Sequence, residues 1–429
     1  MLDIRFVREH ADEVKENIRK KFQDKKLPLV DEVIELDKRI RELKVQGDEL
    51  RQERNATSDA IGALFREKKV DEANLKKARV VEINDALTGI EKEEAELSLV
   101  LKEKMMAIPN IIADDVPIGE DDSKNVEEAC FGEAKVPNFD IPYHAEIMAS
   151  FSGLDKEAAG RVSGNGFYYL MGDIARLHSA VLAYARDFMI DKGFIYCIPP
   201  FMIHGDAVDG VMSFAEKDAM MYKIEGEDLY LIGTSEHSMI AKFKDQLLKE
   251  SELPITMTSY SPCFRKEVGA HGIEERGVYR IHQFEKQEMI VICRPEESEA
   301  WYEKMWNYSV ELFRTLDIPV RKLVCCSGDL ADLKYRSCDI EAWSPRQGKY
   351  FEVCSCSNLT DAQARRLGIR YKKENGEKEF AHTLNNTVIA PPRMLIAFLE
   401  NNLMSDGSVL IPEVLRPYMG GKERLVPNK

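Results

Sequence analysis

Apolar residues recur with heptad spacing along two polar segments of the N-terminal quarter of the chain. In the first segment they are Val33, Leu36, Ile40, Leu43, Leu50, Ile61 and Leu64, and in the second Val80, Ile83, Leu87, Ile90, Leu97 and Leu101. The charged stretch 67–71 separates the two runs. One apolar seam per helix and a short turn predict an antiparallel coiled coil over about residues 28–105. At about 1.5 Å per residue, such an arm would reach roughly 50–60 Å.

The seam of this predicted coil is imperfect. Gly47, Arg54 and Glu94 interrupt it, which predicts a flexible arm rather than a rigid rod. A coil of this kind serves to bind a partner or to oligomerise, and this segment alone leaves both readings open.

The character of the chain changes at residues 107–140. Helical periodicity is interrupted by three prolines, Pro109, Pro117 and Pro137. Acidic residues cluster between these prolines. This composition predicts an acidic linker between an N-terminal domain, residues 1–106, and a C-terminal domain, residues 141–429.

Beyond residue 141, helical and strand patterns follow one another without strict alternation. Residues 174–189 predict an amphipathic helix that ends at Gly193, and residues 194–198 and 229–232 predict short strands. Strands in hairpin-like succession indicate an α+β fold with a mainly antiparallel sheet flanked by helices. The sequence has neither a GxGxxG turn nor a GxxxxGKS or GxxxxGKT loop, which disfavours dinucleotide-binding and P-loop folds.

Composition limits the expected domain number, cellular compartment and binding partners. A chain of 429 residues with 44% hydrophobic residues is expected to form two or three domains with sizeable cores. No apolar run approaches the roughly 18–20 residues that span a membrane, and the charged start Met1–Arg5 shows no signal peptide, so a cytoplasmic location without membrane contact is expected. The nine cysteines lack paired CxxC spacing, so no zinc is expected and a reducing compartment fits. The net charge of −15 disfavours general nucleic-acid binding but permits a local basic face.

Residues suited to nucleotide chemistry gather in two segments, Cys263–Glu267 and Arg280–Met289. Each predicts a strand, and the two strands are expected to pair antiparallel. The loop that joins them carries Gly269, Gly272, Arg276 and Gly277. Arginine suits a phosphate, phenylalanine suits a base, and carboxylates suit amines and ribose hydroxyls.

In this order, the FRKE, ERG and HQFEKQEM segments resemble motif 2 of class II aminoacyl-tRNA synthetases, in the form found in the seryl-tRNA synthetase family. The resemblance implies that Arg265 binds the α-phosphate and the substrate carboxylate with its planar donor fork. It implies that Glu267 contacts the adenine amine and that Glu288 binds serine. It also implies an ATP pocket lined by Ile281, His282, Gln283 and Phe284, with Phe284 stacked on adenine.

Two further segments extend the resemblance. Residues 193–201 resemble motif 1, in which a helix and a strand form a homodimer interface and end at a proline, here Pro200. Residues 231–236 resemble the serine-binding strand end, which implies that Thr234 and Glu236 bind serine.

Two strands, Asp339–Trp343 and Phe351–Asn358, resemble the pair that carries the family's metal ligands. The resemblance implies that Glu352 and Ser355 hold Mg²⁺ on the ATP phosphates. Mg²⁺ prefers hard oxygen ligands and takes few of them from the protein. The resemblance also implies that ATP contacts Val353 and Cys354 between them.

Residues 382–401 resemble motif 3, in which a strand leads into a helix that carries an arginine. By this resemblance Arg393 binds the γ-phosphate, and Asn385 and Thr387 recognise serine. Helix N-termini favour anions, which fits this placement of the arginine. The segment reads LNNTV where LNGSG is commonest, and Pro391-Pro392 precede the arginine, which leaves the shape of the pocket open.

Over almost the whole chain, the resemblance implies a ligase that joins serine to tRNA. Serine and ATP would give seryl-adenylate, and the seryl group would pass to the 3′ end of tRNA(Ser), with tRNA(Sec) left open. The coiled-coil arm would grip the tRNA. A paralogue that loads another acceptor is the alternative, disfavoured because such an acceptor needs no arm. A decayed, non-enzymatic RNA-binding or coiled-coil protein is disfavoured by the joint retention of Arg265, Glu288, Glu352, Ser355 and Arg393.

Overall fold

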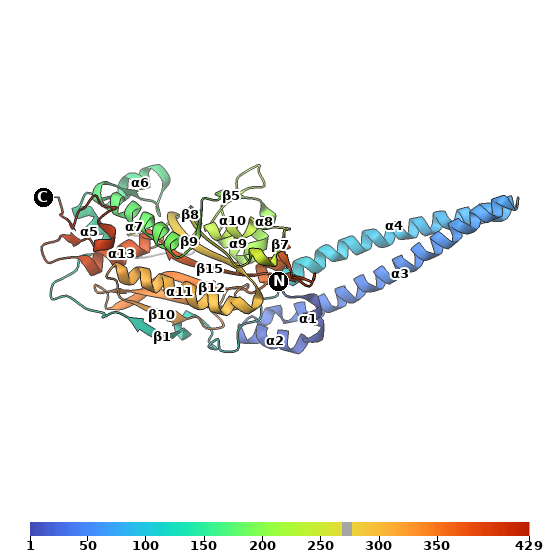
Figure 1. The fold of residues 1–429 in the computed structure, drawn as a ribbon, viewed down its shortest axis with the longest axis horizontal. Coiled ribbons are helices and arrows are strands. Elements are labelled where there is room, and N and C mark those ends of the chain that lie inside the picture. The colour runs from blue at the N-terminus through green and yellow to red at the C-terminus, as the bar shows by residue number, and fades with distance from the viewer. Residues whose placement is uncertain (268–276, 429) are drawn as a thin grey trace. The chain divides into compact units, whose positions relative to one another are not determined.

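The computed structural model describes residues 1–267 and 277–428. Gly269, Gly272 and Arg276 of the expected glycine-bearing loop lie outside the described residues. The chain forms two compact units, one comprising Leu2–Arg19 and Gln23–Pro109 and the other mainly Asn110 onward (Figure 1).

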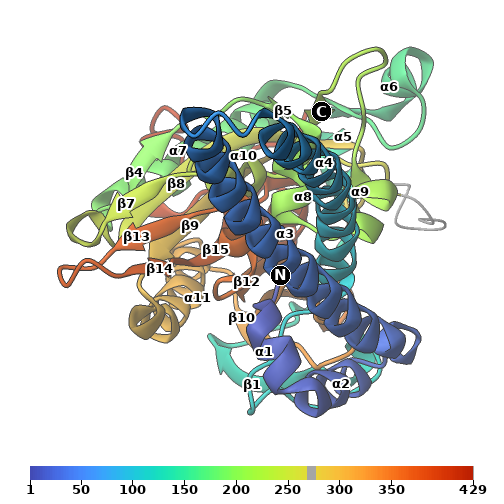
Figure 2. The same cartoon turned by 90° about the vertical axis from the view of Figure 1, so that its right-hand side faces the viewer.

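The N-terminal unit is helical throughout its regular structure. It contains α1 (Ile4–Glu9), α2 (Ala11–Lys20), α3 (Leu27–Arg66) and α4 (Val70–Ala107). The last two run side by side as an antiparallel pair (Figure 2). The predicted coiled-coil arm is therefore confirmed, with its turn where the charged stretch 67–71 placed it.

Packing between α3 and α4 explains two interruptions of the apolar seam. Gly47 is buried between the helices, and a side-chain carbon added there would lie at ordinary contact distance, 3.7 Å, from Ile90 Cγ2 of the facing helix. Glu94 forms an ion pair with Lys44 of the facing helix at 3.6 Å. Such exposed pairs contribute little to stability, about 0–1 kcal/mol each, but they favour one alignment of the two helices.

An eight-stranded sheet forms the centre of the second unit, in the order β1-β10-β11-β12-β15-β9-β8-β4. The strands are β1 (Val126–Phe131), β10 (Val320–Val324), β11 (Arg336–Ser344), β12 (Lys349–Asn358), β15 (His382–Ile389), β9 (Gln283–Cys293), β8 (Ile255–Phe264) and β4 (Ile195–Cys197). Only the edge strand β4 pairs parallel to its neighbour among these strands. The expected α+β fold with a mainly antiparallel sheet is confirmed.

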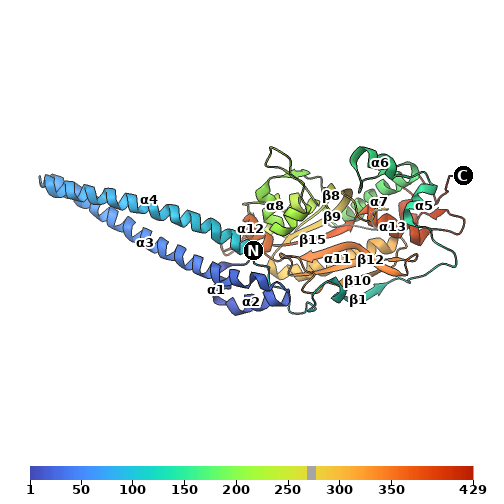
Figure 3. The ribbon, with the colours of Figure 1, turned by 180° about the vertical axis from the view of Figure 1, so that it is seen from behind.

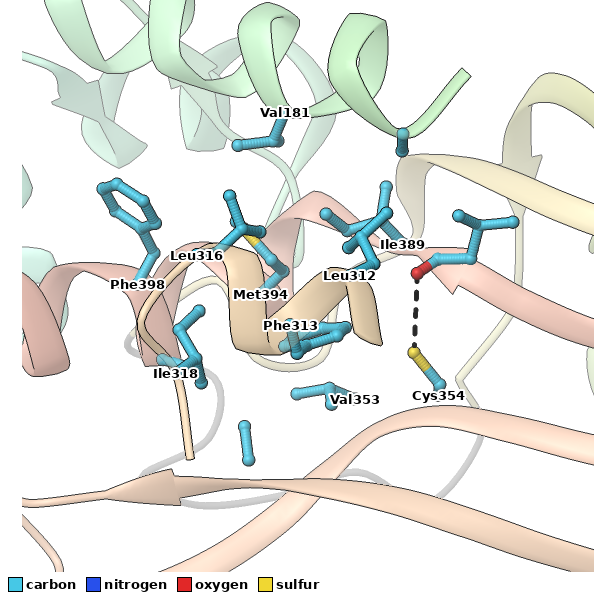
Figure 4. Packing of buried hydrophobic residues seen from close by; sticks show 14 of the residues in the cluster. Val181, Leu312, Phe313, Leu316, Ile318, Val353, Cys354, Ile389, Met394 and Phe398 are labelled. Atoms are coloured by element: carbon cyan, nitrogen blue, oxygen red, sulfur yellow. Dashed lines mark hydrogen bonds between the residues drawn. The ribbon is translucent and has the colours of Figure 1, made fainter. Parts of the chain in front are cut away.

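One face of the sheet is covered by α7 (Gly172–Asp191), α11 (Ser298–Thr315) and α13 (Pro391–Asn402) (Figures 1 and 3). Their apolar side chains meet those of the central strands in one core, where Phe313 and Phe398 are fully buried (Figure 4). In the same core the Cys354 thiol donates to the Val388 carbonyl at 3.7 Å. Burial at about 25 cal/mol per Å² of apolar surface stabilises this packing.

Shorter elements cover the opposite face and the ends of the sheet. The helices are α5 (His144–Ser150), α6 (Lys156–Ser163), α8 (Gly205–Val211), α9 (Phe214–Met220), α10 (Ser235–Ala241) and α12 (Ala362–Leu367). The remaining strands are β2 (Leu154–Asp155), β3 (Tyr169–Leu170), β5 (Met202–Ile203), β6 (Tyr230–Leu231), β7 (Leu247–Lys249), β13 (Arg370–Lys372), β14 (Lys378–Phe380), β16 (Val409–Leu410) and β17 (Arg424–Leu425). In the described ranges, no helix has both the length and the apolar character needed to cross a bilayer.

Part of the expected linker, residues 107–140, belongs to the sheet instead. Its residues Val126–Phe131 form the edge strand β1, which pairs antiparallel with β10. The acidic side chains that suggested a linker are explained by this pairing, because Glu127 and Glu128 form ion pairs with Arg321 and Lys322 of β10. An edge strand needs few apolar residues, which is why composition did not reveal it.

Candidate active site

A cavity of about 330 Å³ opens on the face of the central strands that α7, α11 and α13 do not cover. The two faces of β9 show how the sequence builds it. Met289 and Val291 point into the core, whereas Ile290 packs on the other face with α10 and α12. Phe284, Lys286 and Glu288 follow the parity of Ile290 and line the cavity.

Most of the residues that the sequence nominated meet in this cavity. They are Thr234, Glu236, Arg265, Glu267, Ile281, Phe284, Glu288, Glu352, Val353, Cys354, Ser355, Asn385, Thr387 and Arg393. The side chains of His282 and Gln283 do not line it. His282 precedes β9, which begins at Gln283, and its Nδ1 lies 3.0 Å from the Arg265 carbonyl. Gln283 lines a neighbouring cavity.

Arg265 follows the end of β8 and has a fixed orientation. Its Nε donates to the Gly233 carbonyl at 3.1 Å, and its guanidinium group lies over the Phe284 ring with the centroid at 5.3 Å. Nearby, Arg280 Nη1 donates to Glu267 Oε2 at 2.9 Å. These contacts bring two guanidinium groups, one carboxylate and one aromatic ring to the lining of the cavity.

Arg393 lies in the first turn of α13, behind the two prolines that begin this helix. Its Nη1 donates to Glu352 Oε2 at 2.6 Å, and the guanidinium group lies over the Tyr279 ring. Burial opposes ionisation of Glu352, but the cation of Arg393 prevails and lowers the pKa of this carboxyl group.

A β-bulge brings Glu352 and Ser355 to one face, although a spacing of three would separate them on a regular strand. Ser355 pairs with Asp339 of β11 and Glu352 pairs with Glu341, so Val353 is the extra residue. Because Asp339 and Glu341 are two residues apart on β11, their partners point to the same side. Burial and the nearby Glu352 raise the pKa of Asp339 to about 7.

A second polar cluster surrounds Glu288. Thr234 Oγ1 donates to Glu288 Oε1 at 2.6 Å, and Lys286 forms an ion pair with the same oxygen. The Glu288 side chain is only 2% exposed, and its Oε2 has no hydrogen-bond partner within the described part of the chain. Thr387 lies directly opposite Glu288 on β15, and its Oγ1 accepts from Lys286 Nζ at 3.5 Å.

Glu236 forms the neighbouring wall of this cluster. The backbone N–H of Glu236 donates to the Thr234 hydroxyl that caps α10, at 3.2 Å. Its side chain faces the cavity and is otherwise enclosed by protein, so burial and the nearby Glu288 raise its pKa to about 7. Burial also lowers the pKa of the adjacent His237 to about 3, so this imidazole is neutral at neutral pH.

Two lysines in the cavity were not among the predicted site residues. Lys286 has the same parity on β9 as Phe284 and Glu288, so alternation along the strand could have nominated it. Lys334 precedes β11 in an irregular segment, and no sequence pattern places its side chain in the cavity.

Two protein families match this chain. Residues 1–112 match the seryl-tRNA synthetase N-terminal domain, and residues 221–402 match the class II core domain of tRNA synthetases for G, H, P, S and T. The serine–tRNA ligases of Methanospirillum hungatei and Methanocella arvoryzae are 42% and 41% identical, over 99% of this chain and 100% of each relative. The crystal structure of Pyrococcus horikoshii seryl-tRNA synthetase complexed with ATP superposes with a TM-score of 0.94 at 38% identity, covering both chains completely.

Proposed function

This chain belongs to the seryl-tRNA synthetase family, and we propose how its cavity serves a serine–tRNA ligase. The observation that carries the proposal is the set of charged groups that line one cavity. Arg265 and Arg393 line it together with the carboxylates of Glu236 and Glu288. Phosphates need cations and an amino group needs carboxylates, so this cavity suits both ATP and serine.

Activation is an in-line displacement at the α-phosphorus of ATP. A serine carboxylate oxygen forms the new bond to phosphorus, and the bond to the bridging oxygen of pyrophosphate breaks. The guanidinium group of Arg265 binds the α-phosphate and the attacking carboxylate together, which aligns the reacting atoms and stabilises the charge that develops. A hydroxyl of the terminal tRNA ribose then attacks the seryl carbonyl carbon, and AMP leaves.

The other predicted residues divide between the two substrates. On the ATP side, Phe284 stacks on adenine, Glu267 accepts from its amine, and Arg393 exchanges Glu352 for the γ-phosphate. On the serine side, Glu236 and Glu288 bind the ammonium group, and Asn385 and Thr387 bound the side-chain pocket with Thr234. We also propose that His282, Gln283, Val353 and Cys354 contact ATP, although the first two do not line the cavity.

A magnesium ion fits the residues present. The bulge in β12 presents the Glu352 carboxylate and the Ser355 hydroxyl on one face, and both offer the hard oxygen atoms that Mg²⁺ prefers. Bound there, the ion would neutralise charge on the ATP phosphates. The hydrogen bond from Arg393 holds the Glu352 carboxylate in position.

We propose that residues 1–106 bind tRNA(Ser) through the arm and that residues 141–429, together with the strand β1, catalyse both reaction steps. We also propose a homodimer formed through α7 and β4, because Ile195 and Ile198 at that sheet edge are 67% and 62% exposed. The nine cysteines are unpaired thiols, which fits the proposed cytoplasmic location.

Two assays on the purified chain test this function. Serine-dependent exchange of pyrophosphate into ATP measures activation, and charging of tRNA(Ser) measures transfer, with tRNA(Sec) as a second acceptor. Exchange without charging would favour a paralogue that loads another acceptor. Absence of exchange with any amino acid would refute the enzymatic function.

A further inference from the structure

Gln363 of α12 lies behind the cavity and is fully buried. Its amide nitrogen donates to Glu236 Oε1 at 2.8 Å and to the Val211 carbonyl at 3.1 Å. Its amide oxygen accepts from the Thr383 hydroxyl at 2.6 Å. Both amide hydrogens therefore have acceptors, and the oxygen has a donor.

This network allows one orientation of the amide. If the Gln363 amide were turned over, its oxygen would face the Glu236 carboxylate and the Val211 carbonyl, and three acceptors would meet without a proton. Thr383, which is also fully buried, holds the correct orientation by donating to the oxygen. An unsatisfied buried polar group costs about 1–3 kcal/mol, so the turned arrangement is strongly disfavoured.

The charged groups around Glu236 explain why such a contact matters. Glu288 and Lys286 approach it from β9, Lys334 approaches from the segment before β11, and Glu216 of α9 lines the same cavity. Glu288 raises the pKa of Glu236, whereas Gln363 and the two lysines lower it. Lys286 is engaged by Glu288, so the amide of Gln363 is the short contact that Glu236 itself receives.

We propose that Gln363, oriented by Thr383, is a positioning residue that holds the Glu236 carboxylate in the serine subsite and thereby sets the affinity for the substrate ammonium group. Gln363 touches neither substrate in this arrangement, because Glu236 lies between its amide and the cavity. The inference rests on the proposed serine-activating function and names a residue that the sequence motifs did not.

Three variants of the full chain test this role: Gln363→Met, Gln363→Glu and Thr383→Val. Methionine removes both polar contacts at similar volume, glutamate keeps the shape but sets a second carboxyl group against Glu236, and valine removes only the orienting hydroxyl. Gln246→Met is the matched control, since Gln246 is exposed and its side-chain amide donates to the Lys242 carbonyl at 3.3 Å, away from the cavity lining. Pyrophosphate exchange from pH 6 to pH 9 gives KM for serine, KM for ATP and kcat.

Gln363→Met removes a hydrogen bond to a charged group, and the loss of such a bond should raise KM for serine roughly 10- to 100-fold. KM for ATP should stay within about twofold, because the network does not reach the ATP side. The acidic limb of kcat/KM for serine should move to higher pH in Gln363→Met and further in Gln363→Glu, since each change favours the protonated form of Glu236. Thr383→Val should show the same pattern more weakly.

Equal changes in the KM values for serine and ATP, or an unmoved acidic limb, would overturn the positioning role. If Gln363→Met does not fold, Thr383→Val decides the question by the same two readouts. Failure of the wild-type chain to exchange pyrophosphate with serine would instead refute the proposed function, so the two failures are distinguishable.

Discussion

Replacing Lys286 with methionine should destabilise the catalytic unit because it strips a buried carboxylate of its cation. The side chains of Lys286 and Glu288 are 9% and 2% exposed, and they form an ion pair. Removing one partner of such a pair typically costs about 3–5 kcal/mol. We expect the lower end, about 3 kcal/mol, because Glu288 keeps its 2.6 Å hydrogen bond from Thr234 and because the cavity admits water.

The loss of stability in Lys286→Met should depend on pH, and the pKa values of the nearby carboxyl groups determine whether it grows or shrinks as pH rises. Burial and Glu288 already raise the pKa of Glu236 to about 7, and Lys286 opposes this rise, so its removal raises this pKa further. A carboxyl group whose pKa is higher in the folded than in the unfolded chain lowers stability as pH rises through that interval. The difference between wild type and Lys286→Met should therefore be largest at pH 8 and smaller at pH 5.

Urea unfolding at pH 5, 6.5 and 8 measures this difference. Lys135→Met is the matched control, because Lys135 pairs with Glu133 at a surface where both side chains are more than 70% exposed. Such a pair is worth at most about 1 kcal/mol. The double variant Lys286→Met/Glu288→Gln should recover part of the loss. A Lys286→Met loss below 1 kcal/mol at pH 8, or an equal loss at pH 5, would refute the reasoning.

Three further outcomes follow from the same site. Arg265→Lys should lower kcat/KM for serine-dependent exchange at least about 100-fold, since lysine loses the planar fork and the bond to Gly233; a rate near wild type would contradict the phosphate role. Deleting residues 30–104 should abolish tRNA charging but spare exchange, because every predicted site residue lies beyond residue 233; unchanged charging would favour an oligomerisation role for the arm. Thr387→Ser should lower the ratio of kcat/KM for serine to that for threonine, because a tight pocket rejects an added methyl at about 1–3 kcal/mol; an unchanged ratio would mean that Thr387 does not face the substrate.

Local periodicity sufficed to predict the arm and the two strands, β8 and β9, that border the cavity. The heptad spacing of α3 and α4 is a property of each helix alone, so it can be recognised in the sequence before the partner helix is known. The strand β9 likewise alternates in the sequence, and its parity predicted the shared face of Phe284 and Glu288. The resemblance to the family supplied the roles of these residues, which periodicity does not contain.

Features that depend on how the strands and helices pair could not be predicted from the sequence. The bulge that unites Glu352 and Ser355 exists only in the register of β11 against β12, which are joined by a turn whose geometry the residues do not specify. The sequence of β1 is typical of an acidic linker, and only its pairing with Arg321 and Lys322 of β10 explains its acidic residues. Gln363 donates to Glu236 from α12, more than 120 residues further along the chain.

The charge balance within the cavity explains how a chain of net charge −15 can hold an anionic nucleotide. Three cations that line the cavity have a carboxylate partner: Arg393 with Glu352, Arg280 with Glu267, and Lys286 with Glu288. These three groups are therefore oriented when the chain folds, and a phosphate can replace a carboxylate partner instead of ordering a free side chain. The released carboxylates then face the cationic groups that accompany ATP and serine, so charge on both sides stays compensated as the site fills.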